Sequence, residues 1–171
     1  ILVGFSAEIQ SEDPILIGGV WLLSGPNAME GQHEKRGAEI ARDEINAEGG
    51  ILGRPIEIKE YDCRGAVDAT INATNIVVGN QDIVAVAGPC RSVLTLAIES
   101  IFHKGGLPWL CGAQSNQLNY SKTDNPYFFR TRAVDTLFGA AQGSFAVGEL
   151  GLKEVAILYN NDDWGVGMME S

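Results

Sequence analysis

The residues best suited to chemistry lie where an apolar segment is followed by an amphipathic segment. Ser92 follows the β-branched run at residues 83–87 and the break at Gly88-Pro89. A strand, a tight turn and a helix start in that order make half of a βαβ unit. Such a helix start presents unpaired N–H groups beyond the carboxyl end of the strand, where ligands bind in open α/β sheets. We interpret Ser92 as a ligand contact, with a plain helix cap as the alternative.

The remaining inventory argues against most other chemistries. Three widely spaced cysteines, with only His33 and His103 beside them, form no CxxC pair, so we predict no metal site. The chain carries no GxSxG elbow, no P-loop and no GxGxxG after its first strand, which disfavours an enzyme and any cofactor. We interpret the neighbouring Asp162 and Asp163 as a loop acid and a helix cap.

Length and composition favour one globular domain. The chain has 171 residues, of which 45% are hydrophobic and 20% charged, and this supports a sizeable core. A formal net charge of −10 argues against nucleic acid, which requires a basic face. No apolar run approaches the roughly 20 residues of a membrane helix.

The elements that would position Ser92 alternate between strand and helix. Helices are expected near residues 30–48, 67–79, from 92, and from Asp135, a predicted N-cap, to 150. Strands are expected near residues 15–22, 55–61, 83–87, 107–110, 127–131 and 153–159. This alternation predicts an α/β fold with a doubly wound parallel sheet. Right-handed crossovers then give the flavodoxin-like strand order 2-1-3-4, with the first strand central.

Six motifs in consistent order give the chain a family resemblance from Ile15 to its last residue. It resembles the leucine/isoleucine/valine-type substrate-binding proteins of bacterial ABC transporters, which have the periplasmic-binding-protein type I fold. The motifs are LSGP at 23–26, DEINAEGG at 43–50, ILGRPIE at 51–57, AGP at 87–89, FRT at 129–131 with Asp135, and AILY at 156–159 with DWG at 163–165.

The resemblance implies two doubly wound lobes with a ligand in the cleft between them. Residues 15–151 would form the first lobe and residues 152–171 the start of the second. Residues 1–14 would be an N-terminal extension or signal remnant; an ordered N-terminal strand is the alternative for the first ten. The expected function is capture of an amino acid or related small carboxylate for an ABC importer. The expected partner is the membrane permease, and the expected location is the bacterial periplasm or cell exterior.

The resemblance also implies a set of ligand contacts. Ser92 would meet the ligand carboxylate through its hydroxyl and N–H, with Cys90 close to it. The loop formed by Gly112, Ala113, Gln114 and Ser115 replaces the usual Ser-Ala-Thr and would contact the amino group and the carboxylate. Gln114 exchanges a short hydroxyl for a longer amide. N–H groups of both segments should converge on one point, which would bind an anion.

Two departures from the family pattern bear on the ligand. Glu30 stands where an aromatic residue is frequent, and Trp164 stands where tyrosine is usual. A larger or aromatic ligand, or one with a cationic group near Glu30, fits these changes as well as a branched-chain amino acid does. The alternatives are a solvated acid at a helix start for Glu30 and lobe packing for Trp164.

Two alternatives concern the pairing of the cysteines and the function of the protein. Related proteins carry a disulfide between the loops after the second and third strands, which implies a Cys63–Cys90 bond here, with Cys90–Cys111 as the competing pair. A ligand-binding sensor domain of a receptor or regulator on the same fold is the alternative function.

Overall fold

A computed structural model describes residues 13–171 of the chain. The extension predicted for residues 1–14 therefore lies outside the described residues, except for its last two. Among residues 13–171 no helix is long and apolar enough to cross a bilayer.

The centre of the fold is a parallel sheet with the order β2-β1-β3-β4-β5. Its strands are β1 (Ile15–Trp21), β2 (Ile56–Asp62), β3 (Ile83–Ala87), β4 (Trp109–Cys111) and β5 (Phe128–Arg130). β1 pairs with both β2 and β3, so it is central, and every pairing is parallel. The predicted order and fold class are confirmed.

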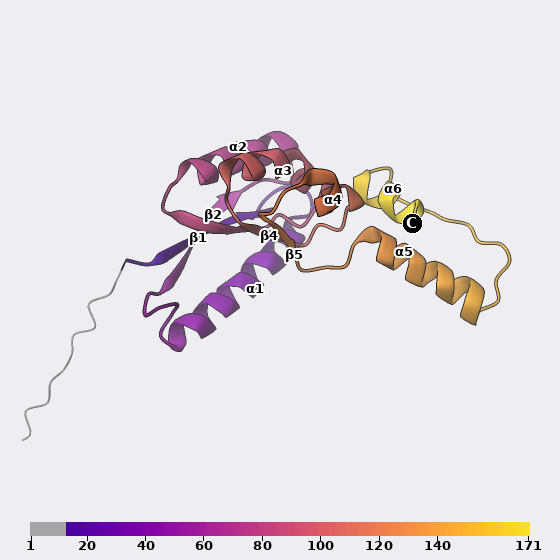
Figure 1. Ribbon diagram of the computed structural model, residues 1–171, viewed down its shortest axis with the longest axis horizontal. Coiled ribbons are helices and arrows are strands. Elements are labelled where there is room, and N and C mark those ends of the chain that lie inside the picture. Colours follow the sequence, from indigo (N-terminus) through magenta and orange to yellow (C-terminus); the bar gives the residue numbers. More distant parts are fainter. Residues whose placement is uncertain (1–12) are drawn as a thin grey trace, which may run out of the picture.

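Helices cover the two faces of this sheet, as Figure 1 shows. α2 (Val67–Gly79) and α3 (Ser92–Gly105) pack side by side on one face, and α1 (Ala28–Ala47) lies on the other. Two short helices, η1 (Asn116–Leu118) and α4 (Tyr120–Thr123), lie between β4 and β5. This layering brings the starts of α1 and α3 to the same edge of the sheet, where the strands have their carboxyl ends.

The main core lies between the sheet and the pair α2–α3. Trp109 is 1% exposed and packs edge-to-face on Phe102 and Phe128, at ring-centroid distances of 4.4 and 5.3 Å. Such aromatic pairs add about 0.5–1.5 kcal/mol beyond the burial of their area. The other fully buried members of this core include Val20, Leu22, Val77, Leu94 and Ile98.

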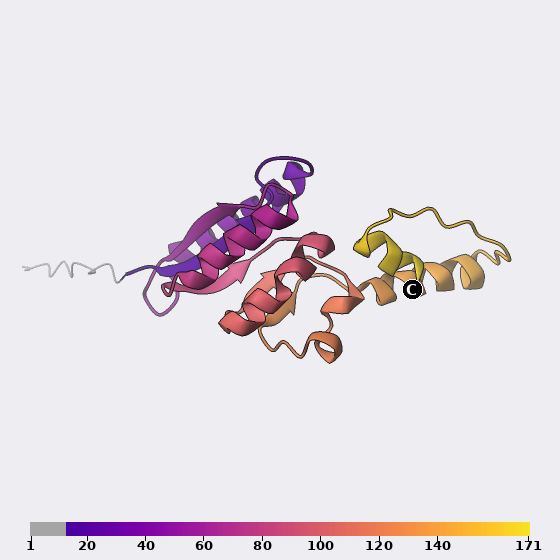
Figure 2. The same cartoon turned by 90° about the horizontal axis from the view of Figure 1, so that it is seen from above.

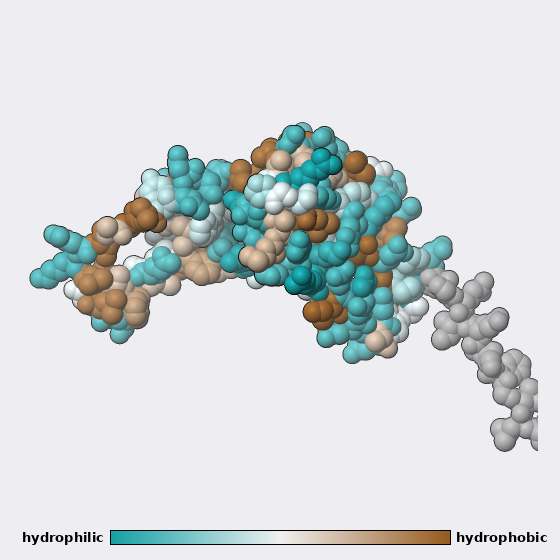
Figure 3. Space-filling view, turned by 180° about the vertical axis from the view of Figure 1, so that it is seen from behind, coloured by the Kyte–Doolittle hydropathy of each residue, from teal (hydrophilic) through white to brown (hydrophobic). Residues whose placement is uncertain are grey.

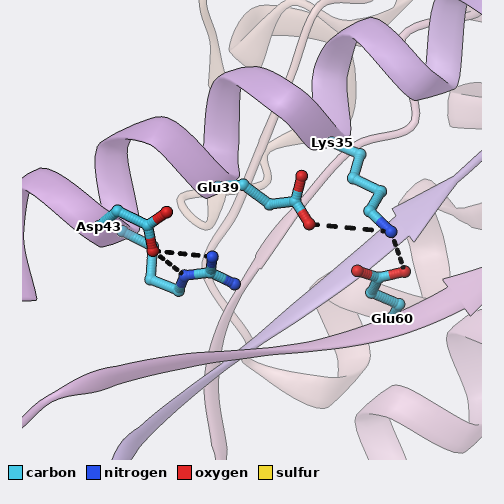
Figure 4. Close-up of polar contacts among 5 residues, drawn as sticks. Lys35, Glu39, Asp43 and Glu60 are labelled. Atoms are coloured by element: carbon cyan, nitrogen blue, oxygen red, sulfur yellow. Dashed lines mark hydrogen bonds and ion pairs between the residues drawn. The ribbon is translucent and has the colours of Figure 1, made fainter.

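An ion pair links α1 to the sheet (Figure 4). Lys35 Nζ lies 2.8 Å from Glu60 Oε2 on β2 and 3.8 Å from Glu39 Oε1 on its own helix. Exposed pairs of this kind are worth about 0–1 kcal/mol, so this pair contributes little to the attachment of α1.

The chain after β5 leaves the sheet. α5 (Asp135–Ser144) continues as the π-helix η2 (Phe145–Glu149), and a loop returns to α6 (Asp163–Met169), which packs beside the start of α5. Figures 1 and 2 both show α5 and α6 lying beyond the sheet.

Two local predictions are wrong. Residues 153–159 form no strand, although their sequence is typical of one. They are exposed, and no described strand lies beside them to accept their backbone hydrogen bonds. The N-cap of α5 is Val134, not Asp135. Asp135 is instead the first helical residue, and both its carboxyl oxygens are buried without a partner among the described residues.

Candidate functional site

A cleft of about 580 Å³ opens at the carboxyl edge of the sheet. It lies within the 300–1,000 Å³ range typical of small-molecule sites. Its walls come from the starts of α1 and α3, the segments after β4 and β5, and the loop before α6. The lining residues are Asn27, Glu30, Glu34, Cys90, Arg91, Ser92, Val93, Gly112, Gln114, Thr131, Arg132, Asn160, Asp162 and Trp164.

Ser92 is the first residue of α3 and joins two walls of the cleft. Its Oγ accepts a hydrogen bond of 3.3 Å from the backbone N–H of Ser115, beyond the neighbouring strand. The cap position belongs to Arg91, and no side chain caps the helix, so the plain-cap alternative for Ser92 is wrong. Because Ser92 Oγ accepts this bond, its own hydrogen stays available for an acceptor in the cleft.

The loop after β4 contributes two of its four predicted residues to the cleft. Gly112 and Gln114 line it, and Gln114 Nε2 also donates to Ala133 O at 3.4 Å. Ala113 does not line the cleft; it is fully buried and packs with Cys111 and Leu118. Ser115 also lies outside the lining, because its hydroxyl accepts from the Gln117 N–H at 3.2 Å and caps η1.

Glu30 and Glu34 form an acidic wall on the first turns of α1. Glu30 is exposed, as expected of a helix-start acid, yet it lines the cleft, and Cys90 Sγ lies 3.8 Å from its Oε2. Burial raises the pKa of Glu34 to about 7, and the charge of Glu30 adds to this increase. Hydrogen bonding to Cys90 acts in the opposite direction and lowers the pKa. Glu34 therefore exchanges its proton near neutral pH.

The opposite wall comes from the loop before α6. Trp164 lines the cleft and is 41% exposed, so packing leaves its side chain accessible. Asp162 caps α6 by accepting from the Gly165 N–H at 2.8 Å, and Asp163 is the first residue of that helix, so the pair supplies the predicted helix cap. Its second oxygen lies 3.7 Å from Arg91 Nη2, so an ion pair connects the starts of α3 and α6.

The predicted Cys63–Cys90 disulfide is absent, and all three cysteines are free. Their thiols lie in different surroundings: Cys63 is buried beside Thr70, whereas Cys90 faces Glu30 and Glu34. Burial raises the pKa of each thiol, to about 12 for Cys111, so all three are protonated at neutral pH. Within residues 13–171 no group of three or more metal-ligating side chains gathers.

The prediction from sequence included Glu30 but missed the other charged residues of the lining, Glu34, Arg91, Arg132 and Asp162. Glu34 stands four residues after Glu30 on one helix, a spacing that puts both residues on one face. Arg91 directly precedes the predicted contact Ser92, and Arg132 directly follows the predicted strand at residues 127–131. Only the fold shows that these charges share a cleft with Asp162.

A parallel α/β sheet with a polar cleft at its carboxyl edge defines a class of small-molecule-binding proteins. The chain belongs to the periplasmic binding protein family, whose family model matches residues 14–171.

Individual relatives agree with this assignment. The Leu/Ile/Val-binding protein of Escherichia coli K12 is 28% identical over 168 residues, which cover 98% of this chain and 45% of that protein. An amino acid binding protein of Pseudomonas aeruginosa is 26% identical over 157 residues, covering 92% of this chain and 42% of the relative. The chain thus spans less than half the length of these relatives.

Solved structures show the same likeness. A branched-chain amino acid transporter substrate-binding protein from Streptococcus pneumoniae, in complex with isoleucine, superposes with a TM-score of 0.83 at 28% identity, over 92% of this chain and 45% of that one. A periplasmic binding protein type 1 from Bordetella pertussis gives a TM-score of 0.85 at 27% identity, over 92% and 44% of the two chains.

Proposed function

We propose that this chain forms the first lobe of an extracytoplasmic solute-binding protein that serves an ABC importer. Residues 15–151 form that lobe, and residues 152–171 begin the second. The protein captures an amino acid or a related small carboxylate and delivers it to a membrane permease. It performs no chemistry on the ligand, and it works in the periplasm or outside the cell.

One observation carries the proposal: the hydrogen bond from the Ser115 N–H to Ser92 Oγ. This bond brings the start of α3 and the loop after β4 to one point in the cleft. Unpaired N–H groups of a helix start, a free hydroxyl hydrogen and the guanidinium of Arg132 then surround a place for an anion. A carboxylate there gains charge-assisted hydrogen bonds, each worth about 1.5–3 kcal/mol.

Isothermal titration calorimetry on the complete gene product tests the proposal. The titrants are the amino acids one by one, with their decarboxylated amines as matched controls. We expect at least one amino acid to bind and its amine to bind more weakly, since the amine lacks the carboxylate. A folded protein that binds none of them, or that prefers the amine, contradicts the proposal.

A further inference from the structure

Glu30 and Glu34 give the cleft negative charge that the described residues do not neutralise. They lie one helical turn apart, and both line the same wall. Neither takes part in any ion pair found among residues 13–171. Glu34 Oε2 is buried and has no hydrogen-bond partner in that part of the chain.

The two guanidinium groups of the cleft lie elsewhere. Arg91 pairs with Asp162 at 3.7 Å across the cleft. Arg132 lies beside Gly112, whose Cβ, if present, would be 3.3 Å from Arg132 Cδ. The charge of Arg132 lowers the pKa of Glu34, so Arg132 acts on this carboxyl, but it forms no ion pair with Glu34 or with Glu30. Among residues 13–171 no cation therefore pairs directly with either glutamate.

We propose that the ligand carries a cationic group, an ammonium or a guanidinium, between Glu30 and Glu34. This inference rests on the proposed function, which places the ligand carboxylate at Ser92. The ligand is then a basic amino acid or a compound with the same two charged ends. The cleft volume of about 580 Å³ accommodates such an elongated molecule.

An aliphatic ligand suits this wall poorly. Its side chain would displace water from two carboxylates without donating a hydrogen bond to them. Burying an unpaired charge in this way is costly. A cationic side chain removes the same water but supplies donors to both carboxylates. The acidic wall therefore selects for charge. In contrast, the Escherichia coli relative is described as a Leu/Ile/Val-binding protein, and the Streptococcus pneumoniae structure holds isoleucine.

Ligand binding is then linked to a proton on Glu34. The groups that face this carboxyl are Glu30 from α1, Cys90 from the loop before α3, Cys111 from β4 and Arg132 after β5. Both thiols stay protonated, and Glu34 is the group among these whose pKa lies near neutral pH. A bound cation favours the ionised carboxylate, so affinity rises as pH increases from 6 to 8.

Paired ligands that differ in charge test the inference by calorimetry on the complete gene product. Arginine is compared with citrulline, which has nearly the same shape, and lysine with norleucine, whose side chain is shorter by the ammonium group. We expect at least one charged member to bind on the order of tenfold tighter than its neutral counterpart. That preference should shrink by a similar factor at pH 6, and citrulline binding should change little between the two pH values.

Variants locate the effect. Glu30→Gln and Glu34→Gln should each reduce the preference for the charged ligand, and Glu34→Gln should also remove its pH dependence. Glu44→Gln is the matched control, because it removes the same charge from an exposed position on the same helix. It should leave both the preference and its pH dependence unchanged.

The failures of the two proposals are distinguishable. If neutral amino acids bind as tightly as their charged counterparts, the cationic ligand is excluded and the proposed function stands. If the folded protein binds no amino acid, the proposed function itself is contradicted. A preference that survives both glutamate substitutions would place the cation elsewhere and overturn the inference.

Discussion

At the scale of single residues, the Ser92 hydroxyl has two tasks. Its Oγ accepts from the Ser115 N–H, which holds the loop after β4 against α3, and no acceptor for its own hydrogen is found among the described residues. Alanine removes both contributions but leaves the backbone N–H groups of the helix start in place.

Ser92→Ala should weaken ligand binding by about 1–3 kcal/mol without unfolding the protein. Calorimetry measures the affinity, and circular dichroism confirms the fold. Ser100→Ala is the control, because Ser100 is an exposed serine on the same helix. Equal affinities for Ser92→Ala and the unchanged protein would remove Ser92 from the site.

The sequence predicts such single positions unevenly. Ser92, Gly112 and Gln114 follow strand ends, and the rule that ligands bind at the carboxyl edge of a parallel sheet locates them without coordinates. Glu34 belongs to a helix with many charges, and nothing in its local sequence separates it from Glu39 or Glu44. Its exceptional property is burial near Cys90, which depends on how α1 docks.

At the scale of elements, the position of α1 depends on one close backbone contact. Gly31 is buried in its first turn, and a Cβ there would lie 2.3 Å from Leu22 O and 2.4 Å from Leu22 N. Backbone atoms cannot rotate away as a side chain can. The absence of a side chain at Gly31 therefore sets how closely Glu30 and Glu34 approach the cleft.

Gly31→Ala should lower the free energy of unfolding by about 2–4 kcal/mol, because α1 must move away from the end of β1. Gly37→Ala on the same helix meets nothing within 4 Å and should instead raise it by about 1 kcal/mol. Urea denaturation of the two variants measures both changes. A Gly31→Ala variant as stable as Gly37→Ala would show that the close contact is not needed.

Elements also show where sequence-based prediction ends. The strands β1 and β3 to β5 were predicted from local apolar runs, and β2 was predicted from alternating apolar and polar residues. Their order follows from crossover handedness. Residues 153–159 have a run of the same kind but remain outside the sheet. A strand exists only where a neighbour accepts its hydrogen bonds, and that condition is not local.

At the scale of the whole molecule, an apolar surface gathers on the segment beyond the sheet. Figure 3 shows brown surface on this part of the chain. Large side chains are exposed there, with Leu158 at 103% and Val147 at 64%. Contiguous apolar patches above a few hundred Å² are rare on soluble monomers.

The 171-residue chain expressed by itself should therefore bind the dye ANS and associate as its concentration rises. Replacing Ile157 and Leu158 by serine should reduce both effects. Replacing Lys153 and Glu154 by serine is the control, since it introduces the same residues at unchanged net charge and leaves the apolar surface intact. Fluorescence and analytical ultracentrifugation measure the outcome, and a monomer that binds no dye would contradict the expectation.

The separation between the cleft and the core has an evolutionary consequence. Glu30, Glu34, Gln114 and Trp164 line the cleft, and none belongs to the cluster built around Val20, Phe102 and Trp109. If the proposed function holds, substitutions at these cleft positions alter the choice of ligand with little effect on folding. Duplicated genes of this kind would diverge first at these positions. The apolar runs that build their cores would stay recognisable after their ligands had changed.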